Sequence, residues 1–544
     1  MMKFLPLVAG LFLFLSYGCE SEKVLTSEEL LAHIEAVRED SIKGHIAYLA
    51  DDKLLGRLPG TPEYQLAIDY VINKYREIGV LPAGDQGTFL QEVTIRQSHV
   101  TEGSSYLALG GDTLQMGEDY FFLGNLVEMD TETNGEVLFV GYGIEAPGLG
   151  YNDYENTDVK GKILLMASGA PEDFPSNERA YFSSIGTKLL LAEKHGAAGV
   201  FLTIPPGRIQ FSALYDRYKT QGNKGIKGGG DEVYGMRTFS KDLGFVSYVN
   251  WEKVDKFMGT TGITADSLWS AYSKKSSYPR ELNIQAHAAV TCSFSEFKSA
   301  NVVGKIEGSD KKEEYIVHSA HLDHVGIGKP VAGDSIYNGA HDNASGVASL
   351  LEIARLYATL PAKPSRSVLF LMVTAEEMGL LGSLYFASHP TVPKEQIIAN
   401  VNTDMPTLIA PLMSIEPLGA KHSSIMTQVE KSAGLLQVEI MDDHMPEQVR
   451  FVRSDQYSFI LQGIPSLHVK YGIKTGEPGQ TLQEKIKDFT DNVYHKPSDE
   501  LNNLFDFEAA RTYVKLNFLI SYFINEEEQR PLWKEGDFFG TFVE

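Results

Sequence analysis

The chain has 544 residues, of which 43% are hydrophobic and 22% are charged, a balance that is typical of folded proteins and excludes a largely disordered chain. This length exceeds what one hydrophobic core usually supports, so we expect two or three domains. The formal net charge is −24, and no stripe of Lys and Arg interrupts the acidic sequence. Such a chain repels phosphate backbones, and we therefore expect no nucleic-acid partner.

The N-terminal residues 1–19 have the pattern of an export signal. Lys3 precedes an apolar run over residues 4–17, which is too short to span a bilayer core of about 30 Å. Cys19 follows a small residue, as at the processing site of a bacterial lipoprotein, and Cys292 is the only other cysteine. We predict export from a bacterial cell and a lipid anchor at Cys19, facing the periplasm or the cell surface. The alternative is an ordinary signal peptide, with Cys19 cleaved off or left free.

Residues 25–115 are predicted to form a helical lead-in to an α/β domain. Residues 28–50 have a helical pattern, and residues 59–80 place apolar side chains at helical spacing. Gly79 follows this second pattern and is a typical residue at a helix end. We interpret the segment as the first part of a domain that continues later in the chain.

Residues 116–279 have a different pattern. Short β-rich runs such as EVLFVGYG and KGKILLMAS alternate with many glycines. We therefore predict a separate, β-rich unit over this segment.

From residue 280 to residue 544, strands and helices alternate. EYIVHSAHLD, SVLFLMVTAEE, IIANVNTDM and PSLHVK are apolar runs of strand length, and VASLLEIARLYA between them has helical spacing. This alternation predicts an α/β fold with a mostly parallel sheet that is covered by helices on both faces. In such sheets, ligands bind at the carboxyl ends of the strands.

Side chains that can bind metal follow three of these strands. His321 and Asp323 end the first strand, Glu376 and Glu377 the second, and Asp404 the third. Because the carboxyl ends of parallel strands lie at one edge of the sheet, we expect these side chains to converge there.

Two loops add further candidates. Asp342 lies in NGAHDNASG between a glycine-containing loop and a helix, and His495 lies in the late loop DNVYHKPSDE. Two imidazoles and three carboxylates suit two Zn²⁺ ions, because each ion can take one imidazole and one carboxylate while the third carboxylate bridges them. Two ions about 3.5 to 4 Å apart can together acidify a bound water.

The motifs HLD, GAHDNASG, TAEEMGLLGS, NTDM and YHKPSD, in this order, resemble those of the zinc aminopeptidases typified by bacterial leucyl aminopeptidase. Relatives of that family include glutamate carboxypeptidase II, glutaminyl cyclases and the transferrin receptor. The resemblance covers residues 28–115 and 285–525. Between them, VLFVGYGIEAPGLGYNDYENTDVKGKILLM resembles the protease-associated domain. The resemblance implies a zinc exopeptidase domain over 25–115 and 280–544, with a protease-associated insert at 116–279.

The resemblance also implies a role for each site residue. The implied metal ligands are His321, Asp342, Glu377, Asp404 and His495, with Asp342 bridging the two ions. Glu376 corresponds to the general base that takes a proton from the metal-bound water and passes it to the leaving amine. Asp323 corresponds to the aspartate that orients His321. Tyr494 stands where some relatives carry a tyrosine that binds the oxyanion, and simple packing is the alternative for this residue.

Some residues depart from the family pattern or compete with it. His341 stands in the bridging loop where many members have aspartate, and Gln456 stands where histidine is frequent, beside Asp455 and its expected substrate contacts. His318 and His324, in HSAHLDH, are rival ligands to His321, and the spacing to Asp323 favours His321.

We therefore predict a dinuclear zinc-dependent metallopeptidase that acts on peptides as an aminopeptidase. The alternatives are a glutaminyl cyclase with one zinc ion, a carboxypeptidase, or a non-catalytic binding protein on a peptidase frame. The sequence shows no arginine patch dedicated to acidic C-termini, and it leaves the preferred residue at the cleaved end and the oligomeric state open.

Overall fold

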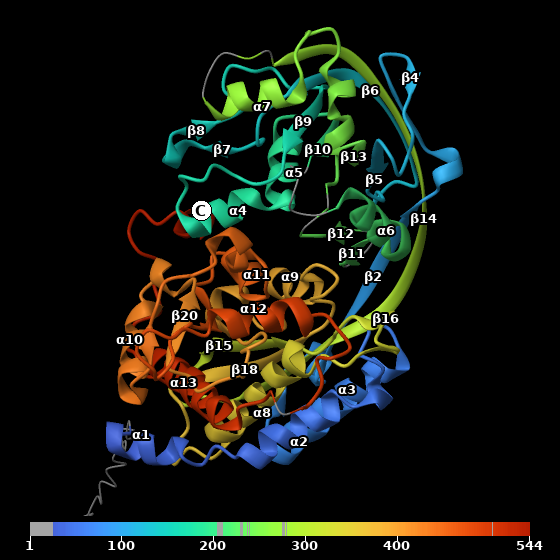
Figure 1. Ribbon diagram of the computed structural model, residues 1–544. Helices are drawn as coiled ribbons and strands as arrows, with labels where there is room; N and C mark the ends of the chain where they lie inside the picture. Colours follow the sequence, from blue (N-terminus) through green and yellow to red (C-terminus); the bar gives the residue numbers. More distant parts are fainter. Residues whose placement is uncertain are drawn as a thin grey trace, which may run out of the picture.

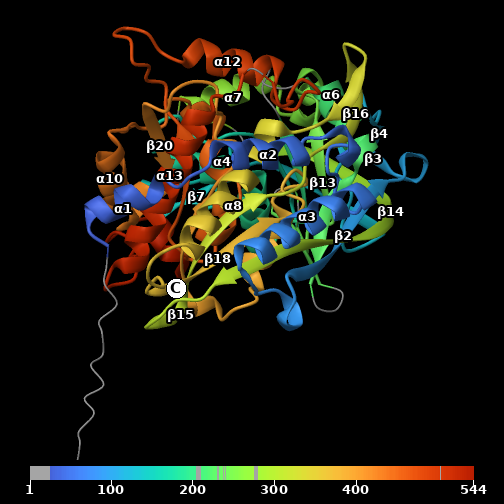
Figure 2. The same ribbon diagram turned by 90° about the horizontal axis from the view of Figure 1, so that it is seen from below.

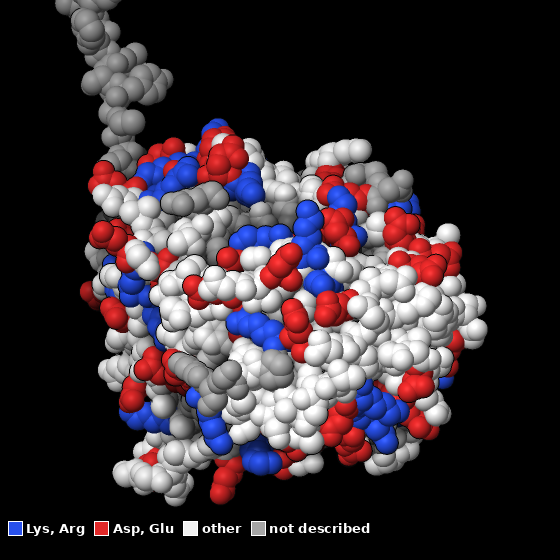
Figure 3. Space-filling model, turned by 90° about the horizontal axis from the view of Figure 1, so that it is seen from above, with Lys and Arg blue, Asp and Glu red and all other residues white. Residues whose placement is uncertain are grey.

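The computed structural model describes most of the chain, and the predicted export signal with Cys19 lies outside the described part. The described residues are 25–203, 210–228, 232–236, 238, 240–274, 278, 280–502 and 504–543. Among them, no helix has the length and apolar character that a membrane crossing requires. On the face seen from above, acidic and basic side chains are interspersed (Figure 3).

Two sheets are joined by one long strand. The first half of β14 (Glu281–Ile306) pairs with β3 (Tyr106–Leu109) and β6 (Asp130–Phe139). Its second half pairs with β2 (Leu90–Val100) and β18 (Arg366–Val373). Figure 1 shows β14 running down one side of the molecule, from the upper sheet to the lower sheet. The name "upper sheet" is used for the strands around β6, and "lower sheet" for those around β18.

The lower sheet is parallel at its centre. Strands β18, β15 (Lys311–His321), β19 (Ile397–Asn402) and β22 (Ser466–Tyr471) run parallel in this spatial order. β14 beside β18 and β20 (Ser414–Leu418) beside β22 are antiparallel. β18, β19 and β22 are buried along their whole length, because both faces of the sheet are covered. The predicted fold class and its four strands are confirmed.

Helices cover both faces of the lower sheet. In β18, Val368, Phe370 and Met372 face one core, and Leu369 and Leu371 face the other, as the alternation of a strand requires. The helices of the first core include α2 (Glu39–Leu49), α3 (Pro62–Ile78), α8 (Ser345–Ala358), α10 (Ile425–Leu436) and α13 (Phe507–Glu526), and those of the second are α9 (Leu381–Ser388) and α11 (Gln456–Ile460). Figure 2 shows α2, α3 and α8 together on the side seen from below.

The helical pattern predicted over residues 28–50 is present, as two helices with a break between them. α1 (Ser27–Ile34) begins with a capping box at Thr26 and ends at Ile34, and α2 follows from Glu39. Between them, Arg38 is extended and its backbone N–H donates to Oε2 of Glu352 on α8 at 3.1 Å. A tertiary contact thus breaks the helix. The predicted helix end at Gly79 is confirmed, since α3 stops there and Gly79 has φ +92°.

The upper sheet contains a parallel group of its own. The strands β9 (Ile163–Ala167), β10 (Gly199–Thr203) and β13 (Phe245–Val249) follow β6 in this spatial order, and all four are parallel. At the edge beyond β13, β5 (Tyr120–Phe122) pairs with β13 in the antiparallel direction. β3 and the first half of β14 complete the other end. The upper sheet therefore takes strands from both sides of residues 116–279.

Shorter elements connect these layers. The remaining helices are α4 (Ser176–Ser183), α5 (Ile185–Lys194), α6 (Phe211–Gln221), α7 (Ala265–Ser273) and α12 (Gln483–Asn492), and the remaining strands are β1 (Leu81–Pro82), β4 (Asp112–Thr113), β7 (Glu145–Ala146), β8 (Tyr151–Asn152), β11 (Asn223–Lys227), β12 (Val233–Tyr234), β16 (Gly326–Val331), β17 (Asp334–Tyr337) and β21 (Glu439–Ile440).

Candidate metal centre

The carboxyl edge of the lower sheet gathers the predicted metal ligands. β15 ends at His321, β18 ends three residues before Glu376, and β19 ends two residues before Asp404. These strands are parallel neighbours, so their ends lie side by side. Asp342 comes from the loop before α8, and His495 from the loop after α12.

Two groups of possible ligand atoms form there and share Asp342. The first group is His321, Asp342 and Asp404, and the second is His324, Asp342, Glu377 and His495. Within each group the ligand atoms lie within 4.8 Å of one another. The structure thus brings all five sequence-predicted ligands together, and it adds His324, which the sequence offered only as a rival to His321.

In the first group, His321 lies between two carboxylates. Its Nε2 is 3.1 Å from Oδ1 of Asp342 and 3.3 Å from Oδ1 of Asp404. Its Nδ1 hydrogen-bonds to the backbone carbonyl of Asp323 at 3.0 Å, which turns Nε2 toward the carboxylates. Burial lowers the pKa of His321, but the hydrogen bonds to Asp342 and Asp404 outweigh it and raise this pKa well above its usual value. The site therefore favours a cation between the carboxylates.

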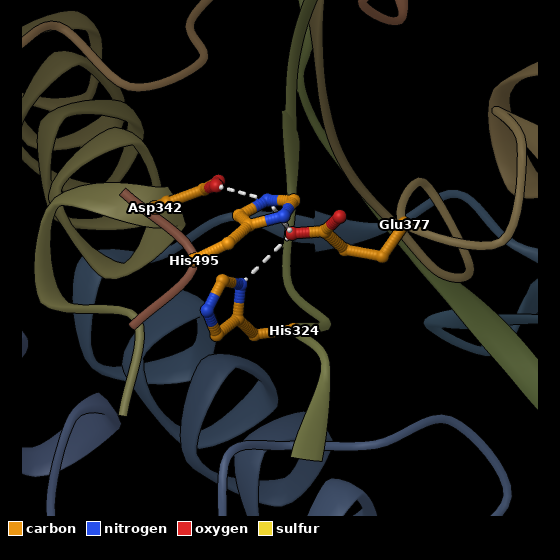
Figure 4. Close-up of side chains that lie close together, drawn as sticks. All are labelled: His324, Asp342, Glu377 and His495. Carbon is orange, nitrogen blue, oxygen red and sulfur yellow. Dashed lines mark hydrogen bonds and ion pairs between the residues drawn. The ribbon is translucent and has the colours of Figure 1, made fainter. Parts of the chain in front are cut away.

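In the second group, two imidazoles converge on one carboxylate (Figure 4). Oε1 of Glu377 is 2.9 Å from Nδ1 of His324 and 3.0 Å from Nε2 of His495. Nε2 of His495 is also 3.0 Å from Oδ2 of Asp342. Burial raises the pKa of Glu377, yet the charge of His495 and the hydrogen bond to His324 bring it well below its usual value. Glu377 is thus held as a carboxylate, the form that binds metal.

Asp323 contacts residues of both groups and forms a hydrogen bond with a backbone atom of the second. Its carboxylate accepts the backbone N–H groups of Glu376 at 3.2 Å and Glu377 at 3.4 Å, and it lies 4.0 Å from Nδ1 of His321. Burial raises the pKa of Asp323 to about 7. The contact to the imidazole comes from the Asp323 carbonyl, while the carboxylate fixes the turn that carries both glutamates.

Asp499 fixes the loop that carries Asp342. It accepts the backbone N–H groups of His341 at 2.9 Å and Asp342 at 3.1 Å, and it lies 3.1 Å from Nδ1 of His341. The His341 ring stacks on Phe505 with centroids 3.8 Å apart. His341 therefore packs behind the loop. Asp499 is the aspartate that ends the YHKPSD motif, but it was not among the predicted site residues.

A cavity of about 120 Å³ lies in front of both groups. Asp342, Asp404 and His495 line it, together with Glu376 and Tyr494. Burial, and then the charges of Glu377 and Asp404, raise the pKa of Glu376 well above its usual value. A carboxylate with a raised pKa beside a cavity is suited to accept and return a proton.

The other sequence candidates occupy different places. The Tyr494 ring lies 4.0 Å from the His495 ring, and its hydroxyl is 3.5 Å from Nη2 of Arg453. Gln456 is buried and donates to the carbonyl of Phe451 at 2.7 Å, away from the cavity lining. His318 is fully buried against the ring of Phe370 and belongs to neither metal group of the described residues.

Comparison with known proteins identifies the catalytic domain. Residues 301–519, which contain both metal groups, match Peptidase family M28. The matched segment is therefore a family M28 peptidase domain. The predicted family resemblance and the predicted enzyme class, a zinc-dependent metallopeptidase, are thereby confirmed.

Two curated relatives and one solved structure are similar to different lengths of this chain. The probable lipoprotein aminopeptidase LpqL of Mycobacterium tuberculosis is 25% identical over 527 residues, which cover 91% of this chain and 89% of the relative. The probable leucine aminopeptidase 2 of Aspergillus oryzae is 31% identical over 249 residues, 42% of this chain and 46% of the relative. The structure of an aminopeptidase from Aneurinibacillus sp. strain AM-1 covers 91% of this chain and 95% of its own, with a TM-score of 0.50 and 18% identity, and therefore shares the fold.

Proposed function

We propose that this family M28 enzyme is an aminopeptidase that hydrolyses the N-terminal peptide bond of peptides with the help of two zinc ions. The observation that carries the proposal is the pair of ligand groups that share Asp342 and face one cavity together with Glu376. The names of the relatives given above, which are aminopeptidases, support the choice of the N-terminal bond.

The donor atoms fit zinc. Each group combines at least one imidazole with carboxylates, which is the set that zinc takes in catalytic sites. His321 and Asp404 would hold one ion, Glu377 and His495 the other, and Asp342 would bridge them. When bound, zinc lowers the pKa of a water molecule and polarises a carbonyl group. Buried carboxylates at this density also need cations for stability.

Three side chains of the protein would transfer the proton of the attacking water, stabilise the negative charge on the substrate carbonyl and hold the glutamates in place. Glu376 can accept a proton from the attacking water and then deliver it to the leaving amine. The hydroxyl of Tyr494, at the cavity wall beside His495, can donate a hydrogen bond to the oxyanion that develops on the substrate carbonyl. Asp323 would keep Glu376 and Glu377 in place through their backbone N–H groups.

Cleavage of a defined peptide library, followed by mass spectrometry with and without a chelator, tests the reaction. We expect loss of single residues from the N-terminus, and no cleavage after chelation. Removal of residues from the C-terminus would instead establish the carboxypeptidase alternative. Elemental analysis separates the peptidase from a glutaminyl cyclase, because we expect two zinc ions per chain for the former and one for the latter.

We also propose a role for two other segments. Residues 116–279, in the upper sheet, would be the inserted protease-associated module that their sequence resembles. Residues 1–19 would direct export and lipid attachment at Cys19, a proposal that the name of the lipoprotein relative supports. Growth with a clickable fatty acid should label the wild-type protein and leave Cys19→Ala unlabelled. Labelling of both, or of neither, would contradict the anchor.

A further inference from the structure

One wall of the cavity beside the metal groups carries cations. Lys470 lies on β22, Arg450 and Arg453 lie just before α11, and all three line the cavity. The acidic side chains of the described lining are Asp342, Glu376 and Asp404, which the proposed function uses as metal ligands or as the base. The rest of the charged lining is therefore positive.

Lys470 is the most deeply buried of these cations. Its exposed fraction is 9%, and its Nζ donates to the backbone carbonyls of Asp404 at 3.1 Å and Met405 at 3.0 Å. An ammonium group has three N–H donors, and the third has no acceptor among the described residues. Lys470 is thus fixed at the cavity wall, next to the first metal group. One N–H of its ammonium group remains available to a ligand.

The two hydrogen bonds to the carbonyl groups of Asp404 and Met405 do not by themselves explain why a charged residue occupies this position. Neutral donors can satisfy two carbonyl groups, whereas a buried ammonium has a high desolvation cost. A charge kept at that cost is expected to meet an anion during function.

Arg450 adds a second cation to the same wall. Its Nη2 pairs with Glu416 and Asp443, which balance its charge, and its Nε–H is buried without a partner among the described residues. Arg453 is exposed and lines the same cavity.

The described lining also contains apolar side chains, among polar ones such as Thr407, Gln448 and Ser454. The apolar ones are Met405, Met445, Ile486 and Phe489. A wall with apolar parts and few fixed charges suits a ligand group that has both methylene carbons and a carboxylate.

We propose that this cavity binds a carboxylate of the peptide substrate next to the scissile bond, with Lys470 as the residue that determines this specificity. The carboxylate belongs either to the side chain of an N-terminal Asp or Glu, or to the C-terminus of a dipeptide. The inference rests on the proposed peptidase function and narrows its substrate class.

Matched substrate pairs test the proposal and distinguish the two sources. The first pair is glutamyl and glutaminyl p-nitroanilide, and the second is alanyl-alanine and its C-terminal amide. For at least one pair, we expect the wild-type zinc enzyme to have a kcat/KM at least about tenfold higher for the carboxylate member, the effect of one charge-assisted hydrogen bond. The pair that shows the preference identifies the source of the carboxylate.

Three variants connect the preference to Lys470. Lys470→Met should bring the ratio within the pair close to one, and Lys470→Arg should keep most of it. Each ratio is internal to one preparation, so partial loss of folded enzyme does not change it. Lys363→Met is the matched control, because Lys363 has 60% of its side chain exposed, pairs with Glu307 and does not line the cavity. This variant should keep the wild-type ratio.

The outcomes separate the two levels of the proposal. If the wild-type enzyme cleaves the members of both pairs equally well, or if Lys470→Met keeps the preference, the carboxylate inference is wrong and the peptidase function stands. If the zinc-loaded enzyme cleaves none of these four substrates and no member of the peptide library, the proposed aminopeptidase function fails, and the inference fails with it.

Discussion

The lower and the upper sheet each bury ionisable side chains, but these side chains are satisfied in different ways. Beside the upper sheet, the carboxylate of Asp153 accepts the Ile144 N–H at 3.1 Å and the hydroxyl groups of Tyr151 and Tyr272, and Lys188 on α5 donates to a backbone carbonyl. In the lower sheet, carboxylates and imidazoles face one another and a cavity.

Altered pKa values occur in both sheets and therefore do not single out the functional site. Burial raises the pKa of Asp153 and lowers that of Lys188, although neither residue lines a described cavity at the metal centre. What distinguishes the lower sheet is that the possible metal-ligand atoms of several side chains converge, within 4.8 Å of one another in each group. The comparison predicts that changes in the lower group affect catalysis, and that changes in the upper group affect stability alone.

The largest expected effect is on catalysis, from Glu376→Gln. The amide keeps the shape of the side chain but cannot accept the proton, so we expect kcat to fall by about 10²- to 10⁴-fold, with zinc content unchanged. Steady-state kinetics and elemental analysis measure the two quantities. Glu352→Gln is a matched control, since Glu352 is also buried but pairs with Arg355 on α8. Full activity in Glu376→Gln would exclude Glu376 as the base.

The next effect is on stability, from Lys188→Met on α5, which packs against the upper sheet. The substitution removes the hydrogen bond from Lys188 to the Tyr142 carbonyl and the charge that lowers the pKa of the buried Asp153, which together cost about 1 to 3 kcal/mol of unfolding free energy. Urea denaturation should show this loss, while kcat/KM on the preferred substrate stays within about twofold of wild type. A large drop in kcat/KM for the folded variant would show that the upper cluster contributes to function.

A smaller effect is expected on metal affinity, from His324→Gln. His324 contacts Glu377 at 2.9 Å, and loss of a partner that holds a metal ligand usually weakens binding by about 10- to 100-fold. Zinc competition with a chromophoric chelator measures this change. His318→Gln is the control, because His318 lies on β15, six residues before His324, but in neither ligand group of the described residues. Equal affinities in the two variants would remove His324 from the metal centre.

The smallest effect is expected on stability, from Glu296→Gln where β14 joins the two sheets. Arg96 on β2 pairs with Glu296 on β14 at 2.8 Å, and the Glu296 side chain is 38% exposed. Because solvent screens such a pair, Glu296→Gln should lower the unfolding free energy by less than about 1 kcal/mol and leave activity unchanged. A loss of several kcal/mol in thermal or urea unfolding would mean that this junction, rather than the buried clusters, limits stability.

Much of the fold and the candidate site could be predicted from the sequence. Apolar runs of strand length that alternate with helical patterns require a parallel sheet, and the carboxyl ends of its strands share an edge. That is why His321, Glu377 and Asp404, far apart in the chain, could be expected to meet. Features governed by contacts between distant segments were missed, such as the break between α1 and α2 where Arg38 donates to Glu352.

The sequence by itself determined the parallel sheet, the order of the motifs and the chemical types of the metal ligands, because these follow from local patterning and strand direction. Only the tertiary structure decided that His324 joins Glu377, that Asp499 holds the Asp342 loop and that Lys470 lies on the cavity wall. These positions depend on how loops and neighbouring strands pack, which no spacing along the chain encodes.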